Sequence, residues 1–250
     1  MASSTIIKIQ KLTVRYQGNT ALQNIALHIN SGKITGIIGP NGAGKSTLIK
    51  GMMGLIQTDQ RCVLVGERSI DTKKKEIAYV EQRNALDLTF PINVEETVLL
   101  GTYPKLGLFK KPTAKEREKA RLALEKVQLT EFSKRQIGEL SGGQLQRVFI
   151  ARVLAQDADI IFLDEPFVGI DMLSEKVVVG ILKELKQQGK TIIIVHHDLH
   201  KVLDYFDDVI LLKKELIAFG DVTNTFTNKN IQKAYGESMG DIQIKGVKDE

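Results

Sequence analysis

The chain has 250 residues, of which 42% are hydrophobic and 26% charged, with a net charge of +5, as is ordinary for a soluble globular protein. The lone cysteine excludes an internal disulfide and indicates a reducing compartment. No apolar run approaches the ~20 residues that a membrane helix requires, and we expect no signal peptide. Lysine clusters without interleaved aromatic residues indicate a solvated surface rather than a nucleic-acid site.

The first part of the chain predicts strands separated by turns. Up to about Val65, short β-rich runs alternate with turn sequences such as YQGN and NSGK. The apolar run ITGII, residues 34–38, has the composition of a strand buried on both faces. A glycine-rich loop follows, and then a predicted helix with four apolar residues on one side, namely Leu48, Ile49, Met52 and Met53.

The middle of the chain, residues 84–139, is richer in helix formers. Its stretch TAKEREKARLALEKV predicts a helix, because Thr113 and Glu116 have the spacing of a capping box. An apolar stripe at the spacing i, i+4, i+7 supports this prediction, and its members are Ala120, Leu124 and Val127.

Two further runs, DIIFL at residues 159–163 and TIIIV at residues 191–195, again predict buried strands. Buried strands separated by helices are typical of an α/β fold with a parallel sheet. Because such sheets bind ligands at the carboxyl ends of their strands, we expect chemistry just after Ile38, Leu163 and Val195. The polar tail after Gly220 predicts no particular structure.

The first strand end carries GPNGAGKST, a match to the phosphate-loop pattern in the required position between a strand and a helix. Glycines let backbone N–H groups surround phosphates, Lys45 reaches the β- and γ-phosphates, and Ser46 can ligate Mg²⁺. The sequence therefore predicts a nucleoside triphosphate site whose members are Gly39, Pro40, Asn41, Gly42, Ala43, Gly44, Lys45, Ser46 and Thr47.

The second strand end carries two acids in IIFLDE. In a chain with a phosphate loop, Asp164 suits coordination of Mg²⁺, and Glu165 suits polarisation of an attacking water. The third strand end carries VHHDLH, where a histidine can sense a γ-phosphate. A zinc site made of these histidines and Asp198 is the alternative, but adjacent residues at a strand end point in opposite directions.

A second candidate anion site lies at LSGGQLQR, residues 140–147. Ser141 and Gln144 have capping-box spacing, which predicts that a helix begins here. Bare N–H groups at a helix start bind anions, although this site has no lysine.

These motifs resemble those of the ATP-binding-cassette (ABC) ATPases, in the family's order and approximate spacing, from Tyr16 to past His197. The resemblance implies an α/β P-loop NTPase fold of ABC type over residues 1–250. It implies a mainly parallel core sheet with an N-terminal antiparallel β subdomain, over residues 1–83 and 155–222. Residues 84–154 would form an inserted α-helical subdomain that includes LSGGQLQR, and residues 223–250 a C-terminal tail.

The resemblance also implies roles for the second anion site. In this family two cassettes pack head to tail, so this site would bind the ATP held by the partner's phosphate loop, through Ser141, Gly142, Gly143 and Gln144. A helix N-terminus can do this without a lysine because it carries a partial charge near +0.5.

Further roles are implied one residue at a time. Tyr16 would stack on adenine, and Glu165 and His197 would support hydrolysis. Gln82 would belong to the same catalytic set, contact Mg²⁺ and move with the transport partner. Asp171 matches the aspartate of the family's Ser-Ala-Leu-Asp loop, but Val168 stands where that loop has a serine and has no hydroxyl. Arg147 and the stretch LDLTFPINVEETVLLG resemble the surface that docks on membrane subunits.

More narrowly, the stretches DLTFPINVEETVLLGTYPKLGLFKKP and EPFVGIDMLSE are similar to ATPase subunits of manganese, zinc and iron importers. This implies an ATPase that uses ATP and Mg²⁺ to power a membrane importer, with manganese the favoured cargo. We expect a homodimer when ATP is bound, at the cytoplasmic face of the membrane, with integral permease subunits and, indirectly, an extracytoplasmic metal-binding protein.

The alternative is a soluble ABC ATPase that acts on nucleic acid or ribosomes. Such proteins typically carry long coiled-coil insertions or two cassettes in one chain. Here residues 82–140 leave room for only a compact helical subdomain, and one phosphate loop is present. A catalytically silent cassette is disfavoured because Lys45, Asp164, Glu165 and His197 are all intact.

Overall fold

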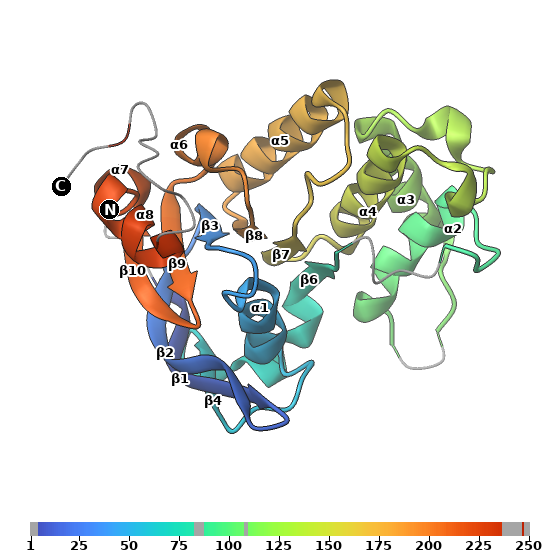
Figure 1. Ribbon diagram of the computed structural model, residues 1–250. Coiled ribbons are helices and arrows are strands. Elements are labelled where there is room, and N and C mark those ends of the chain that lie inside the picture. Colours follow the sequence, from blue (N-terminus) through green and yellow to red (C-terminus); the bar gives the residue numbers. More distant parts are fainter. Residues whose placement is uncertain (1–4, 83–87, 108–109, 237–246, 248–250) are drawn as a thin grey trace. The chain divides into compact units, whose positions relative to one another are not determined.

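A computed structural model describes residues 5–82, 88–107, 110–236 and 247. The chain divides into a first unit, Met1–Lys74 with Gly189–Glu250, and a second unit, Lys75–Gln188 (Figure 1). The expected boundary at residues 83 and 84, the first two residues of LDLTFPINVEETVLLG and the end of the expected tail lie outside the described residues.

The first unit contains an antiparallel sheet with the strand order β2-β1-β4-β5. Alternate residues of β2 are buried, as expected of a sheet with one covered face. The predicted turn YQGN joins β1 to β2 through Gln17 and Gly18, both with positive φ, which matches the strand twist of a two-residue hairpin. The strands are β1 (Thr5–Tyr16), β2 (Asn19–Asn30), β4 (Gln60–Val65) and β5 (Arg68–Ser69).

A second, mainly parallel set of strands in the first unit has the order β10-β9-β3-β8. β3 is parallel to both β8 and β9, whereas β10 is antiparallel to β9. Every residue of β3 and β8 is buried, so the two predicted buried strands are confirmed at their predicted bounds. The strands are β3 (Ile34–Ile38), β8 (Thr191–Val195), β9 (Asp208–Lys213) and β10 (Glu215–Asp221).

Helix α1 (Lys45–Met53) follows β3 and packs on the antiparallel sheet. A methyl group at Gly51 would lie 3.4 Å from the side chains of Leu12 and Val14 in β1, so the helix backbone comes close to the sheet. Three of the four apolar residues predicted to share one side of α1 are buried, and they are Leu48, Ile49 and Met52.

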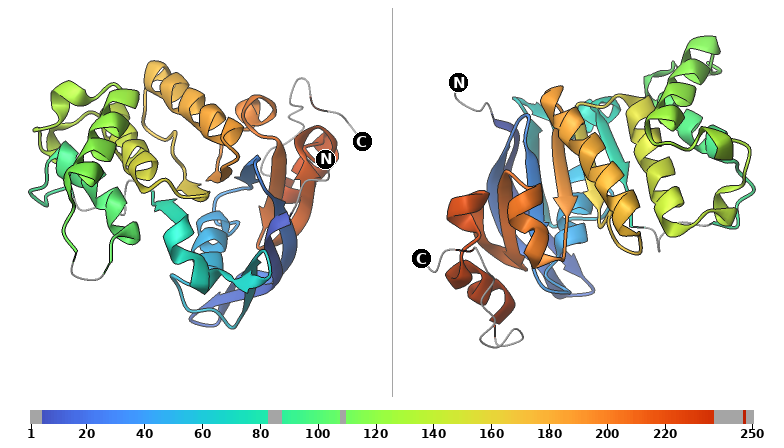
Figure 2. Two further views of the ribbon diagram at one scale, coloured as in Figure 1. Left: turned by 180° about the vertical axis from the view of Figure 1, so that it is seen from behind. Right: turned by 90° about the horizontal axis from the view of Figure 1, so that it is seen from above.

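The polar tail is more ordered than its sequence indicated. It forms α7 (Val222–Thr225) and α8 (Asn228–Tyr235), coloured red in Figure 2, which pack against β9 and β10. Phe226 and Ile231 are buried, and Asp221 and Thr227 cap the two helices. So few apolar residues give no clear periodicity, and the sequence pattern therefore does not predict these helices. The short helix α6 (Val202–Tyr205) completes the helices of this unit's described residues.

In the second unit, β6 (Ile77–Val80) pairs in parallel with β7 (Ile160–Asp164). The strand predicted over residues 159–163 is present but displaced by one residue, so that Asp164 is its last residue. β7 leads through a turn to the long helix α5 (Met172–Gln187).

Three helices pack together in the same unit, namely α2 (Val94–Leu99), α3 (Ala114–Lys126) and α4 (Gly142–Gln156) (Figure 2). The capping boxes predicted at Thr113 and Ser141 are both formed. The predicted stripe of α3 is buried through Ala120, Leu124 and Val127. Short 3₁₀ segments of this unit lie at Leu100–Lys105, Thr130–Phe132 and Ile137–Glu139. Two more, Ile70–Glu76 and Leu199–Lys201, lie wholly or mostly in the first unit. Among the described residues, no helix is both long and apolar enough to cross a membrane.

Candidate functional site

The glycines of the phosphate loop are required by its shape. Gly42 and Gly44 have φ of 76° and 94°, a region that other residues rarely adopt. A methyl group at Gly39 would lie 2.2 Å from the carbonyl oxygen of Leu212, and one at Gly44 would lie 2.8 Å from that of Ala21. The loop after β3 therefore keeps a tight curve that side chains would prevent.

Lys45, the first residue of α1, folds back over this loop. Its ammonium group donates hydrogen bonds to the carbonyl oxygens of Gly39, at 2.8 Å, and Pro40, at 3.0 Å, and the residue is only 7% exposed. The start of α1 has no side-chain cap, because the N-cap residue is Gly44. A buried cation beside an uncapped helix N-terminus fits the phosphate groups of a nucleotide.

Two other predicted residues of the first unit have exposed side chains. Tyr16 ends β1 at the hairpin and is 47% exposed, so its ring is accessible for stacking. His197 is exposed after β8, whereas its neighbour His196 is buried against the rings of Tyr205 and Phe206. The centres of the two histidine rings lie 5.8 Å apart. No group of three metal-ligating side chains forms among the described residues.

In the second unit, Asp164 ends β7 and is 2% exposed. Burial raises the pKa of the Tyr79 phenol above its usual range, and the negative charges of Asp164 and Glu81 raise it further. Sequence reasoning missed Tyr79, whose hydroxyl has no hydrogen-bond partner among the described residues. A buried carboxylate at a strand end is a suitable ligand for a hard cation such as Mg²⁺.

Glu165 and Gln82, predicted from separate motifs, are in direct contact. The side-chain amide of Gln82 donates a hydrogen bond of 2.7 Å to the Glu165 carboxylate. Glu165 has a φ of 52°, an unfavourable backbone conformation for a residue other than glycine that often marks a functional site. The chain turns sharply at Glu165, whose carbonyl oxygen accepts a hydrogen bond from the backbone N–H of Val168.

The second candidate anion site, at the start of α4, is capped by its own side chains. The Ser141 hydroxyl accepts from the N–H of Gln144 at 3.3 Å, and the Gln144 side chain accepts from the N–H of Ser141 at 2.9 Å. Ser141 is exposed, while Gly143 is buried.

Asp171 is the N-cap of α5. Its carboxylate accepts from the backbone N–H groups of Leu173 and Ser174 and from the Ser174 hydroxyl. These hydrogen bonds, first of all that from the Ser174 N–H, lower the pKa of Asp171. Asp171 is therefore held as a carboxylate.

The stretch expected to dock on membrane subunits lies on α2 and the segments beside it. Asn93 and Glu96 form a capping box that begins α2. Arg147 donates a hydrogen bond from its guanidinium group to the carbonyl oxygen of Val127. Exposed apolar side chains of this unit include Phe90, Leu100 and Tyr103.

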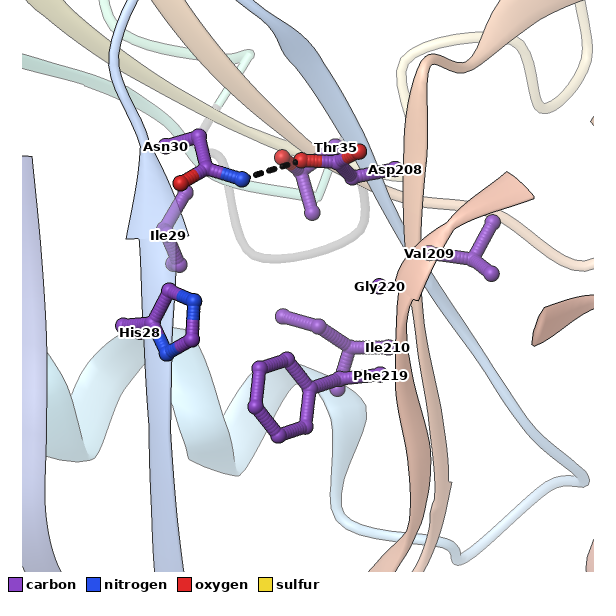
Figure 3. Close-up of a pocket in the computed structure, with 9 residues that line it drawn as sticks. All are labelled: His28, Ile29, Asn30, Thr35, Asp208, Val209, Ile210, Phe219 and Gly220. Carbon is purple, nitrogen blue, oxygen red and sulfur yellow. Dashed lines mark hydrogen bonds between the residues drawn. The ribbon is translucent and has the colours of Figure 1, made fainter. Parts of the chain in front are cut away.

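A small pocket in the first unit does not coincide with any predicted site residue (Figure 3). In it, the side-chain amide of Asn30 donates a hydrogen bond of 2.9 Å to Asp208, which also pairs with Lys33. The pocket is lined by His28, Ile29, Asn30, Thr35, Asp208, Val209, Ile210, Phe219 and Gly220.

The chain is similar to known proteins over most of its length. Residues 22–168 match the family model described as "ABC transporter". The chain is 60% identical over 232 residues to the manganese transport system ATP-binding protein MntB of Listeria monocytogenes, covering 93% of this chain and 97% of that one. It is 46% identical to the zinc transport system ATP-binding protein TroB of Treponema pallidum, covering 94% and 88% of the two chains.

A solved structure extends this likeness to the fold. The inward-facing conformation of a putative metal-chelate type ABC transporter aligns with a TM-score of 0.81 and 29% identity, covering 92% of this chain and 89% of that one. The family match spans more than half of the residues, and the motifs occur in their expected elements. The chain therefore belongs to the ABC transporter family and is one of its ATPase subunits.

Proposed function

We propose that this chain is the ATP-hydrolysing subunit of a membrane importer for divalent metal ions, with manganese favoured over zinc and iron. The observation that carries the nucleotide part is Lys45, which is buried in the glycine loop at the uncapped start of α1. The cargo part is supported by the high identity to proteins named for manganese and zinc transport.

The phosphate-loop residues bind the triphosphate, and Tyr16 stacks on the adenine. Such stacking is worth ~1–3 kcal/mol. Ser46, Gln82 and Asp164 would hold Mg²⁺, which neutralises charge on the phosphates when it is bound. The oxygen-rich donor set of these three residues suits a hard cation.

Glu165 polarises the attacking water, and His197 senses the γ-phosphate. The contact of Gln82 with Glu165 supports this assignment, since it keeps the carboxylate in one orientation before the substrate arrives. The side chain of His197 is exposed and therefore accessible to a ligand.

The working form is a homodimer that assembles when ATP binds. Residues Ser141–Gln144 of one chain contact the nucleotide held by its partner's phosphate loop. The helical subdomain, residues 84–154, docks on integral permease subunits at the cytoplasmic face of the membrane. An extracytoplasmic metal-binding protein acts on the same transporter without touching this chain.

The alternative function, an ATPase that acts on nucleic acid or ribosomes, has less support. The two relatives above are transport proteins by name. An assay of nucleic-acid binding against salt concentration distinguishes the two, because a nucleic-acid ATPase would bind with a steep salt dependence. We expect weak binding or none.

Glu165→Gln tests the ATPase mechanism. The variant should bind ATP, dimerise and hydrolyse ATP very slowly, because an amide cannot polarise water as a carboxylate does. A wild-type rate in this variant would remove Glu165 from the mechanism.

Metal uptake tests the cargo. Cells that lack this chain are supplied with radioactive manganese, with zinc and iron as competitors, and are rescued with wild type or Glu165→Gln. Rescue by wild type alone would support the importer and identify its metal. Unchanged uptake of all three metals after deletion would overturn the cargo proposal and leave the ATPase proposal standing.

A further inference from the structure

The start of α4 touches the start of α5 at a position where no side chain fits. Gly143, the second residue of α4, is buried. A methyl group there would lie 2.3 Å from the Ser174 hydroxyl oxygen and 2.7 Å from Oδ2 of Asp171. Both distances are far below van der Waals contact, so the backbone of the LSGGQ segment lies directly against these two polar side chains.

Ser174 controls one of the two oxygens of Asp171. Its hydroxyl donates a hydrogen bond of 2.7 Å to Oδ2, while Oδ1 accepts the N–H groups of Leu173, at 3.0 Å, and Ser174, at 2.9 Å. The backbone of α5 is therefore capped through Oδ1, and the Ser174 hydroxyl binds Oδ2, the oxygen that faces Gly143. Ser174 itself is 6% exposed, so it has little freedom to move away.

We propose that Ser174 is a positioning residue that holds the Asp171 carboxylate against Gly143, and so fixes the first turn of α4. The inference rests on the proposed function, in which this turn binds the partner's nucleotide. The loop at residues 168–171 and the turn at residues 141–144 then move as one body. The charge-assisted hydrogen bond from Ser174 holds the Asp171 side chain in place, and a shift of either element away from the other would open a gap at Gly143.

Loss of the Ser174 hydroxyl should affect one of the two nucleotide contacts of the chain and not the other. The phosphate loop belongs to the first unit, whereas Gly143, Asp171 and Ser174 all belong to the second. Loss of the Ser174 hydroxyl should therefore weaken recognition of the partner's nucleotide and leave binding by the chain's own phosphate loop unchanged. A purely structural role would not produce this separation.

The test uses the full chain in the Glu165→Gln background, which should hold ATP without turning it over. ATP-dependent dimerisation is measured by sedimentation velocity, and Mg-ATP binding is measured with a fluorescent ATP analogue on dilute, monomeric protein. Ser174→Ala should weaken dimerisation about tenfold, the effect of losing one hydrogen bond to a charged group, and change nucleotide affinity less than about twofold.

Three further variants define the cause. Ser174→Thr keeps a hydroxyl and should restore much of the dimerisation. Asp171→Asn keeps an Oδ1 acceptor but replaces Oδ2 with an NH₂ group, whose hydrogen bond to Ser174 is no longer charge-assisted, so it should weaken dimerisation, though less than Ser174→Ala does. Thr113→Ala removes a hydroxyl from the capped start of α3 in the same unit and should leave dimerisation unchanged.

Each contrary result has one meaning. If Ser174→Ala and Asp171→Asn dimerise as their parent does, the inference is wrong. If Thr113→Ala weakens dimerisation equally, the effect is general destabilisation and the inference is also overturned. If the Glu165→Gln parent itself neither binds ATP nor dimerises, the proposed function fails, and the inference fails with it.

Discussion

Helices α1 and α4 both have glycines at their starts, yet these starts are built differently. Gly44 directly precedes α1, whereas Gly142 and Gly143 are the first two residues of α4, after Ser141. At α1 the glycine N-cap provides no side-chain hydrogen bond, and the buried ammonium of Lys45 lies over the loop. At α4, Ser141 and Gln144 cap the first turn, and no lysine is present. A phosphate at α4 must compete with these caps and meets only the helix partial charge of about +0.5.

Because their starts differ in charge and in capping, α1 and α4 should bind nucleotide differently. The first offers a full charge in a loop shaped by glycines, which suits capture of a nucleotide from solution. The second offers a weaker attraction, which suits contact with a nucleotide that another chain already holds.

Lys45→Ala should have the largest effect. Loss of the ammonium removes the full charge of the first site, and we expect ATP affinity to fall about 100-fold or more, since hydrogen bonds to charged groups are the strong ones. Titration with a fluorescent ATP analogue measures it. Lys50→Ala, in the last turn of the same helix, is the matched control and should bind as wild type does.

Ser141→Ala should affect ATP hydrolysis but not ATP binding by the single chain, and so distinguish the start of α4 from that of α1. It removes one cap of α4, at a cost of ~1 kcal/mol in stability, and one donor toward the partner's nucleotide. We expect ATP hydrolysis to fall about tenfold, with unchanged ATP binding by the single chain. A loss of single-chain binding as large as that of Lys45→Ala would contradict the contrast.

Gln82→Ala should have a smaller effect, because it frees the Glu165 carboxylate but leaves both helix starts intact. We expect a several-fold slower steady-state ATPase rate. Gln82→Glu should be slower still at neutral pH, since it puts two carboxylates within hydrogen-bond distance. Equal rates in the two variants would mean that the contact is absent in the working protein.

The smallest effect concerns stability against pH. The pKa of Asp171 is lowered in the folded chain, so its carboxylate stabilises the fold above the unfolded pKa of ~3.9, and this contribution is lost as pH falls through the folded pKa. Urea unfolding should show wild type more stable than Asp171→Asn at neutral pH, with a gap that closes in acid. Ser141→Ala changes no titrating group, so its gap to wild type should not change with pH in this way.

Regular elements with strong patterns could be predicted from the sequence. The buried strands 34–38 and 191–195 and the capping boxes at Thr113 and Ser141 follow from local composition and spacing, and the structure confirms them. The tail helices could not be predicted, because their few apolar residues are buried through tertiary packing, chiefly on β9 and β10, which local propensity does not reveal.

The site was predictable as a set of residues but not as a set of contacts. The phosphate loop and acid pair have recognisable motifs. In contrast, the pairing of Gln82 with Glu165 joins residues 83 positions apart, and the approach of Asp171 and Ser174 to Gly143 depends on how α4 and α5 pack. Ser174 has one local signal, its spacing of three residues from the capping Asp171, but that spacing alone specifies only a helix start.

The most direct test of the central claim mixes two inactive variants of the full chain, Lys45→Ala and Ser141→Arg, and measures ATP hydrolysis. If the start of α4 serves the partner's nucleotide, each mixed dimer contains one site with both an intact Lys45 and an intact Ser141, and activity returns on mixing. If the two residues serve the same chain's nucleotide, every site carries one defect and the mixture stays inactive. That second result would contradict the account.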